Sequence, residues 1–425
     1  MTKEKEPIVI TAMGAISPFG HGIDTLWSAL KQGARCGTPM ERVWSELQQS
    51  ECPETPDNPG EPVWGMRVDS SKLVDLLGKR GLQYWRTGTK FLLGASVLAM
   101  QEAGLTSENV DPDGLGITIG SNLVGFQSMV DYDYTAITEG PHYTSPMEAP
   151  NTLANAPASH LAIRLKARAL NTTVASGQCA GLDALGYAAK MVRDGRARQV
   201  VAGGVEELSP AALWVYLNAR AISGGTLQKA GLPFAETSTG WLPSEGAAVV
   251  VLEQAKDALA RGARPLAELA GWSSAFASSP SLEKRAAVLQ RTARQALEAA
   301  GVSADEIDVV VSGANGLKGQ DQAEALALRD LLAHNAHVSI APVKGILGES
   351  YGASGLFQTL AAVCMMKHDL IVAAARKNDF LLTSATNETF TKALPWPENT
   401  QGTVLLLAQD LFGSASAIVL RRYND

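Results

Sequence analysis

Two segments of the sequence follow one plan: a strand, a tight turn rich in glycine, and a helix of small residues. Residues 172–192 follow it in the first half of the chain, and residues 339–363 repeat it in the second. In the first copy, Leu182 and Leu185 stand at helical spacing after the turn. This repetition favours a duplicated fold whose halves meet near residues 255–265, although α/β proteins without duplication also produce such echoes.

The rest of the chain alternates short apolar runs with helical segments, which is the pattern of an α/β protein. The clearest helix follows Gly181, and another covers residues 281–300 and is closed by Gly301; a capping box at Ser303 and Glu306 precedes a strand. Residues 36–66 are rich in Pro and Gly and predict a surface excursion. Buried strands are predicted at residues 8–12, 116–120, 199–203, 247–253, 308–312 and 403–408.

Composition limits the classes of function that the chain can have. Its 36 Lys and Arg against 43 Asp and Glu give a net charge of −7, which disfavours a nucleic-acid partner but leaves room for an acidic carrier protein on a local basic patch. A hydrophobic content of 46% supports a large core and excludes disorder. No run approaches the ~20 apolar residues of a membrane span, and residues 1–20 do not resemble a signal peptide, so we expect a cytoplasmic protein without a membrane partner. The four cysteines and six histidines lack disulfide or ligand spacing, and therefore predict no metal.

The first glycine-rich turn, residues 174–182, is where chemistry is expected. A residue on a tight turn between a buried strand and a helix start is presented to a pocket, beside free backbone N–H groups and the positive end of the helix dipole. Such a turn suits a nucleophilic Cys or Ser, because it lowers a thiol pKa and stabilises the oxyanion of acyl transfer. Here it holds Gln178 and Cys179 side by side, and which of them faces the pocket decides the function.

At these motifs the chain resembles the β-ketoacyl synthase family, which has the thiolase fold. Residues 8–20 resemble its opening strand, residues 200–206 the strand after its nucleophile helix, and residues 233–262 the block that closes its first half. The resemblance covers nearly the whole chain. It implies two duplicated α/β halves, residues 1–255 and 256–425, in a five-layered α-β-α-β-α arrangement.

The resemblance also implies where catalytic residues would stand. The family uses a Cys on the turn, two His in separate glycine turns, and a Lys shortly before the second His. A gapless match places Gln178 at the Cys position, Asn315 at the first His and Glu349 at the second. Lys344 is kept, and Phe412 is retained in a degraded form of the family's terminal Gly-Phe-Gly-Gly turn.

These replacements predict an inactive site. The amide of Gln178 is not nucleophilic and cannot carry an acyl thioester, and Asn315 cannot shuttle protons near neutral pH. An ionised Glu349 would repel a malonyl carboxylate, and we expect it to form a buried salt bridge with Lys344. The histidines all lie outside the two turns: His21, His142, His160, His334, His337 and His368.

A chain of this kind resembles the chain-length factor, or ketosynthase-β, of type II polyketide systems. The resemblance implies a heterodimer with an active ketosynthase-α, in which this subunit shapes the tunnel that sets polyketide or polyene chain length. Acyl chains would arrive on the phosphopantetheine of an acyl carrier protein, and the chain would need no cofactor of its own. It also implies that the segment after the strand at residues 116–120 lines the interface and tunnel, with candidates Phe126, Ser128, Met129, Asp131 and Thr135.

Three other interpretations stay open at the sequence level. Cys179 is the nucleophile of an active synthase if the turn carries a one-residue deletion. In a second interpretation, the chain is a malonyl-carrier decarboxylase that uses Gln178 and Asn315. Decarboxylating members of the family with Gln at this position, however, keep both catalytic His residues. Gln178 is otherwise a core amide that only satisfies backbone groups.

Overall fold

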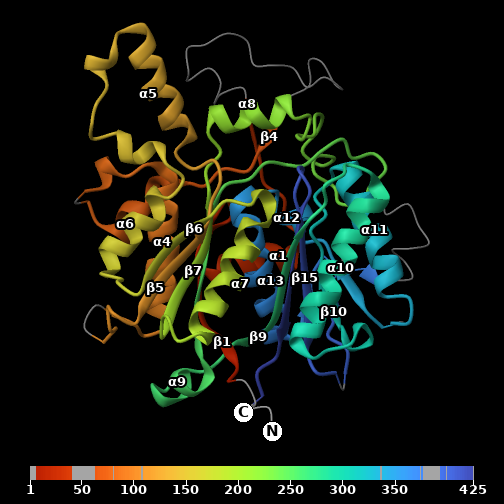
Figure 1. The fold of residues 1–425 in the computed structure, drawn as a ribbon. Helices are drawn as coiled ribbons and strands as arrows, with labels where there is room; N and C mark the ends of the chain where they lie inside the picture. Colours follow the sequence, from red (N-terminus) through yellow and green to blue (C-terminus); the bar gives the residue numbers. More distant parts are fainter. Residues whose placement is uncertain are drawn as a thin grey trace.

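The computed structural model (Figure 1) describes residues 6–40, 63–79, 81–106, 109–335, 337–373, 375–376, 393–398 and 400–424. Most of the predicted surface excursion, residues 41–62, lies outside this description. The described ends of that segment pair as two short strands, β3 (Thr38–Pro39) and β4 (Trp64–Gly65).

The first half of the chain forms a five-stranded arrangement with the order β1-β8-β7-β5-β6. β8 is antiparallel to both β1 and β7, whereas β7, β5 and β6 run parallel. The short β2 (Gly20–His21) pairs with the end of β1. The strands are β1 (Ile8–Ser17), β5 (Leu115–Gly120), β6 (Leu170–Val174), β7 (Gln199–Glu206) and β8 (Gly246–Gln254).

The second half repeats this topology with the order β9-β16-β15-β10-β11 and the same strand directions. A short pairing of β1 with β9 joins the two arrangements into one sheet. The duplicated α/β fold is therefore confirmed, while the boundary at residue 255 stays a prediction. The strands are β9 (Ala267–Phe276), β10 (Val309–Val311), β11 (Ser339–Ala341), β15 (Thr403–Gln409) and β16 (Ser414–Arg421), with β13 (Ala375–Arg376) outside β11.

Three layers of helices enclose the strands, as Figure 1 shows. α7 (Ala180–Arg193) and α13 (Ser354–His368) lie between the two halves of the sheet in one apolar core, which also takes in α1 (Ile23–Gln32). The outer layers are α4 (Thr87–Glu102) and α6 (Ala156–Leu165) on the first half, and α10 (Leu282–Ala300) and α11 (Lys318–Leu331) on the second. The five-layered α-β-α-β-α arrangement is thus confirmed.

The smaller elements complete the fold. α10 begins at the capping Ser281 and ends at Gly301 in the left-handed conformation, as predicted, and the Ser303 capping box starts a single 3-10 turn. α5 (Phe126–Thr138) projects beside α8 (Pro210–Asn218), away from the strands (Figure 1). No helix within the described ranges is long and apolar enough to cross a membrane. The remaining elements are α3 (Leu73–Leu77), α9 (Ala255–Ala260), α12 (Lys344–Leu347), β12 (Leu370–Ile371) and β14 (Leu394–Pro395).

The glycines at the starts of α7 and α13 bring the two repeated turns together. A Cβ on Gly355 would lie 2.6 Å from the Leu182 backbone nitrogen, and a Cβ on Gly181 would lie 3.0 Å from the Gly352 carbonyl oxygen. Only residues without a side chain allow this approach. The turn that carries Gln178 is therefore held against the turn that carries Glu349.

We predict that Gly355→Ala destabilises the protein by about 1–3 kcal/mol, because the new methyl group overpacks this contact. Gly319→Ala is the matched control, since Gly319 is also the second residue of its helix and has open space around its Cβ position. It should stabilise by about 0.5–1 kcal/mol. Urea unfolding measures both, and equal effects would contradict the packing argument.

Candidate functional site

Gln178 and Cys179 occupy the turn η5 (Gly177–Cys179) between β6 and α7, and both are fully buried. The side chain of Gln178 faces a polar cluster, in which its Nε2 donates to Glu349 Oε2 at 2.7 Å and its Oε1 accepts from Gln320 Nε2 at 2.7 Å. Cys179 instead packs in the apolar core between the sheet halves. Gln178 is therefore the residue presented by the turn.

The carboxylate of Glu349 is the centre of this cluster. Its Oε2 accepts from Gln178, from Asn315 Nδ2 at 2.8 Å and from Lys344 Nζ at 2.9 Å. Its Oε1 accepts the Tyr351 backbone N–H at 2.9 Å and the Ser354 hydroxyl. Burial alone would raise the pKa of Glu349, but the Lys344 ammonium and the hydrogen bonds hold it below its usual value. The expected salt bridge is present, and both side chains are 1% exposed.

Gln320 closes the cluster and is absent from the sequence prediction. It joins Gln178 to Asn315, whose Nδ2 also donates to Gln320 Oε1 at 3.3 Å. Asn315 Oδ1 accepts the Leu317 backbone N–H at 3.0 Å. Each polar atom of the Gln178 and Asn315 side chains thus has a protein partner, so the place of a reacting group is filled.

Two buried carboxyl groups on α11 support the Asn315 turn. Asp321 accepts the backbone N–H groups of Asn315 and Gly316, both at 3.0 Å. Glu324 accepts from the Ser312 hydroxyl at 2.5 Å. Burial raises the pKa of both Asp321 and Glu324 to about 7, against the hydrogen bonds that favour their ionised forms.

Cys179 is a poor candidate for a nucleophile in this environment. Burial, together with the charges of Asp183 and Asp410, raises the pKa of its thiol well above the usual value. A thiol must ionise to attack a thioester. Cys179 therefore behaves as a small apolar core residue.

Phe412 does not join the cluster. Its side chain is 73% exposed, while its backbone N–H donates to Asp410 Oδ2 at 2.9 Å. Asp410 is 3% exposed, and its Oδ1 accepts the Gln178 backbone N–H at 3.2 Å. Asp410 was missed at the sequence level, because nothing in its neighbourhood in the chain indicates contact with a turn in the other half.

The five candidate tunnel residues all lie on α5, which the structure does not bring into the Gln178 cluster. Ser128 is buried, Phe126 and Thr135 are half-buried, and Met129 and Asp131 are exposed. α5 packs on α8, where Gln127 Oε1 accepts the Ala211 backbone N–H at 3.0 Å.

The loop leading into α5 is nevertheless tied to the Gln178 turn. The Asn122 side chain exchanges two hydrogen bonds of 2.9 Å with the backbone of Gly177. Glu206, at the end of β7, accepts the backbone N–H groups of Leu123 at 2.9 Å and of Gly352 at 3.2 Å. Burial raises the pKa of Glu206 to about 8, against these backbone hydrogen bonds. Neither connection was predictable from spacing.

No cluster of three or more His, Cys, Asp or Glu side chains within the described ranges has the geometry of a metal site. The polar cluster is compact and saturated by its own hydrogen bonds. The Gln178 amide at the turn is neither a nucleophile nor a proton shuttle.

Comparison with known protein families identifies the class of protein to which the chain belongs. The family model of the beta-ketoacyl synthase N-terminal domain matches residues 5–258, and that of the C-terminal domain matches residues 266–376. The chain belongs to the beta-ketoacyl synthase family.

Curated relatives include both polyketide and fatty-acid types. A Streptomyces coelicolor protein, named as a polyketide beta-ketoacyl synthase 2, is 31% identical over 97% of this chain and 94% of its own length. The actinorhodin polyketide beta-ketoacyl synthase 2 of the same organism is 29% identical over 98% of each chain. A 3-oxoacyl-[acyl-carrier-protein] synthase 2 from Synechocystis is 25% identical over 87% of each. The chain is similar to polyketide ketosynthase-like proteins.

Two solved structures share the fold over nearly the full length. The ishigamide ketosynthase/chain length factor has a TM-score of 0.84 at 23% identity, over 99% of this chain and 100% of that chain. A type II PKS acyl-carrier protein in complex with its ketosynthase has a TM-score of 0.82 at 22% identity, with the same coverage. At these identities the likeness shows the thiolase-like ketosynthase fold.

Removing one partner of the buried pair should cost more than removing both charges. We predict that Lys344→Met lowers the free energy of unfolding by about 3–5 kcal/mol, because Glu349 is left without a cation. The double variant Lys344→Met/Glu349→Gln should lose less than Lys344→Met alone. Chemical unfolding of Lys344→Met, Glu349→Gln and the double variant completes the double-mutant cycle. If the losses of the two single variants add up to the loss of the double variant, the two charges are not coupled.

The raised pKa values of Asp321 and Glu324 predict lower stability at higher pH. Glu324 titrates at 4.5 when unfolded and at about 7 when folded, so the folded state binds its proton more tightly and stability falls as pH rises between these values. A tenfold difference in proton affinity between the two states corresponds to about 1.4 kcal/mol. Glu324→Gln should flatten the fall of unfolding free energy from pH 5 to pH 8, and a slope equal to wild type would refute this assignment.

Proposed function

We propose that this chain is a catalytically inactive ketosynthase homologue, a chain-length factor, that pairs with an active ketosynthase and shapes the tunnel that sets polyketide or polyene chain length. One observation carries the proposal. Gln178 stands where the family resemblance places the nucleophile, and both ends of its amide are bonded to Glu349 and Gln320. Turnover would therefore come from the partner subunit.

The two catalytic alternatives have less support. An active synthase using Cys179 requires a thiolate at a fully buried core position with a raised pKa. A malonyl-carrier decarboxylase requires room for a substrate carboxylate beside Gln178. That place is occupied by the carboxylate of Glu349, whose charge repels a second anion.

The surface of α5 and the segment after it supports a protein partner. Seven of the thirteen exposed large hydrophobic side chains of the described residues lie in this segment, and exposed apolar clusters mark interaction sites. No Lys or Arg occurs between residues 121 and 155. The seven are Met129, Val130, Tyr134, Ile137, Tyr143, Met147 and Leu153.

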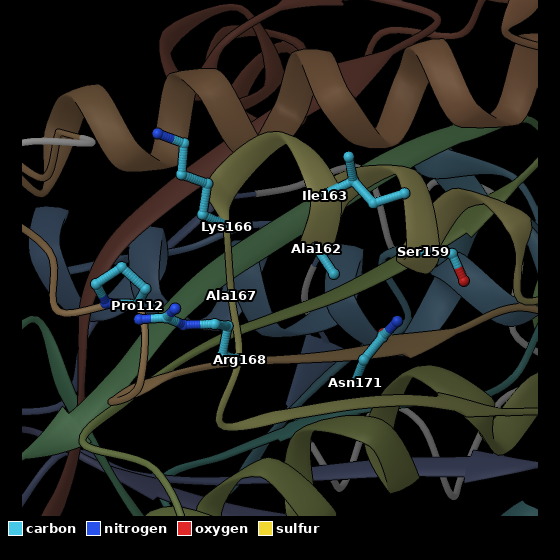
Figure 2. Close-up of a pocket in the computed structure, with 8 residues that line it drawn as sticks. All are labelled: Pro112, Ser159, Ala162, Ile163, Lys166, Ala167, Arg168 and Asn171. Carbon is cyan, nitrogen blue, oxygen red and sulfur yellow. The ribbon is translucent and has the colours of Figure 1, made fainter.

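The free edge of strand β6 also supports a protein partner. Within the described residues, β6 pairs only with β5, and it contains no charged residue or proline to protect a free edge. Beside it lies a hollow of about 540 Å³ between the end of α6 and the start of β6, lined by Ile163, Arg168 and Asn171 among others. Figure 2 shows the side chains that line it. Ile163 is 75% exposed there. An unprotected edge next to an apolar hollow suits the sheet edge of a second α/β chain.

The relatives indicate the substrates and setting of such a complex. One solved relative is a ketosynthase/chain length factor, and another is an acyl-carrier protein with its ketosynthase. In our proposal, acyl chains reach the complex on the phosphopantetheine of a carrier protein in the cytoplasm, and this subunit binds no cofactor of its own.

Incubation with loaded carrier protein tests the proposal. Purified chain, alone and with an active ketosynthase, is mixed with acyl-loaded and malonyl-loaded carrier. We expect condensation products only with the partner, and no thioester on this chain by mass spectrometry. Acylation of Cys179 would support the active synthase instead, and CO2 release by the isolated chain would support the decarboxylase.

Ser128→Phe should shift the heterodimer towards shorter products by at least one extension unit, because Ser128 is the buried member of the α5 candidates. Product analysis by mass spectrometry measures the shift. Thr138→Phe, at the exposed end of the same helix, is the control for added bulk and should leave chain length unchanged. An unchanged product distribution with an intact heterodimer would remove Ser128 from the tunnel.

A further inference from the structure

Two backbone N–H groups that are distant in the sequence meet at one buried carboxylate. The Gln178 N–H donates to Asp410 Oδ1 at 3.2 Å, and the Phe412 N–H donates to Asp410 Oδ2 at 2.9 Å. Asp410 follows directly after β15, and Gln178 lies just before α7. The second half of the chain thus supplies an anion to the turn of the first half.

A pair of backbone N–H groups beside a nucleophile position is the arrangement that binds an oxyanion in acyl transfer. The start of a buried helix favours negative charge at the same place, because its first N–H groups lack partners and its dipole is positive there. Both features are present at Gln178. The two N–H groups are occupied by the two carboxylate oxygens of Asp410, one each.

We propose that Asp410 is a resident occupant of an anion-binding pair formed by the Gln178 and Phe412 N–H groups, where it excludes a thioester oxyanion or a substrate carboxylate. This deepens the proposed function, on which it rests in placing Gln178 at the nucleophile position. It adds a barrier to catalysis that does not depend on the identity of residue 178.

The Asp410 side chain packs closely against residues of the Gln178 turn and of the Glu349 turn. A Cβ on Gly177 would lie 2.0 Å from Asp410 Oδ1, so only glycine leaves room for the carboxylate. The Tyr351 side chain hydrogen-bonds to Asp410, while its backbone N–H binds Glu349. Tyr351 is buried among Tyr216 and Trp241. Tyr351 therefore interacts with both Asp410 and Glu349, the two carboxyl groups that bind the backbone and the side chain of Gln178.

A simpler role for Asp410 would be to cap only its own turn, since an Asp side chain often accepts the N–H two residues on. That role involves Phe412 but not Gln178. The two roles differ in what happens to the Gln178 N–H when the carboxylate is removed.

The test is rescue of Asp410→Ala by sodium formate, whose carboxylate fits the vacated place. The variant should unfold at a lower temperature than wild type, and formate should raise its midpoint by about 2 °C or more above matched sodium chloride. Wild type should show no such rise. Asp308→Ala is the matched control, because Asp308 is also a buried carboxylate that accepts a backbone N–H, from Thr403 at 2.8 Å. Absence of a formate-specific rise in Asp410→Ala, or an equal rise in Asp308→Ala, would overturn the proposal.

Asp410→Asn provides a second measurement in a variant of unchanged shape. One carboxamide oxygen serves only one of the two N–H groups, and the local turn keeps it at Phe412, so hydrogen exchange should become at least several-fold faster at Gln178. Unchanged exchange at Gln178 would overturn the proposal. Neither measurement involves acyl transfer, so a thioester trapped on the wild-type chain would refute the proposed function separately.

Discussion

A single buried carboxylate, that of Glu349, holds the centre of this protein together. An anion without water is tolerated only when a cation and hydrogen-bond donors surround it, and Glu349 has Lys344 and four further donors. Those donors come from the Gln178 turn, from the Asn315 turn and from residues 344–354 around Glu349 itself, so the charge fixes the relative positions of three segments that are far apart in the chain or in its two halves. The neutral amides at Gln178 and Asn315 follow from this, because amide N–H groups satisfy the carboxylate without adding charge.

The duplicated fold explains why these turns meet. In each half, one strand, β6 or β11, runs parallel to its neighbour in the sheet and is followed by a glycine-rich turn and a helix of the central layer. The first half delivers Gln178, and the second delivers Glu349 from the equivalent turn. Parallel strands place their carboxyl ends at one edge, so Asn315 after β10 and Asp410 after β15 arrive there too. The scaffold that would assemble a catalytic site here assembles a set of mutually satisfied polar groups.

The sequence predicted those parts of the fold and site that depend on local pattern. All six predicted strands are present because each is a continuous buried apolar run, whereas β9 and β16 were missed because small and polar residues interrupt them, as in Gly271 and Ser273. Gln178, Asn315, Glu349 and Lys344 were predicted from family motifs and do lie together. Gln320 and Asp410 were not, because their roles depend on contacts across the two halves. Phe412 matches a family motif, yet its side chain is exposed to solvent. A residue type that matches a motif therefore does not determine the position of its side chain.

The polar network around Gln178 and Glu349 also has a structural role. The Asn122 side chain and the Glu206 carboxyl attach the loop before α5 to the Gln178 and Glu349 turns. α5 carries four of the seven exposed apolar side chains of the proposed interface and projects away from the strands beside α8. Replacing the network by apolar residues would leave these backbone groups unsatisfied and would free the start of that helix. In our proposal, the polar cluster therefore anchors the partner surface.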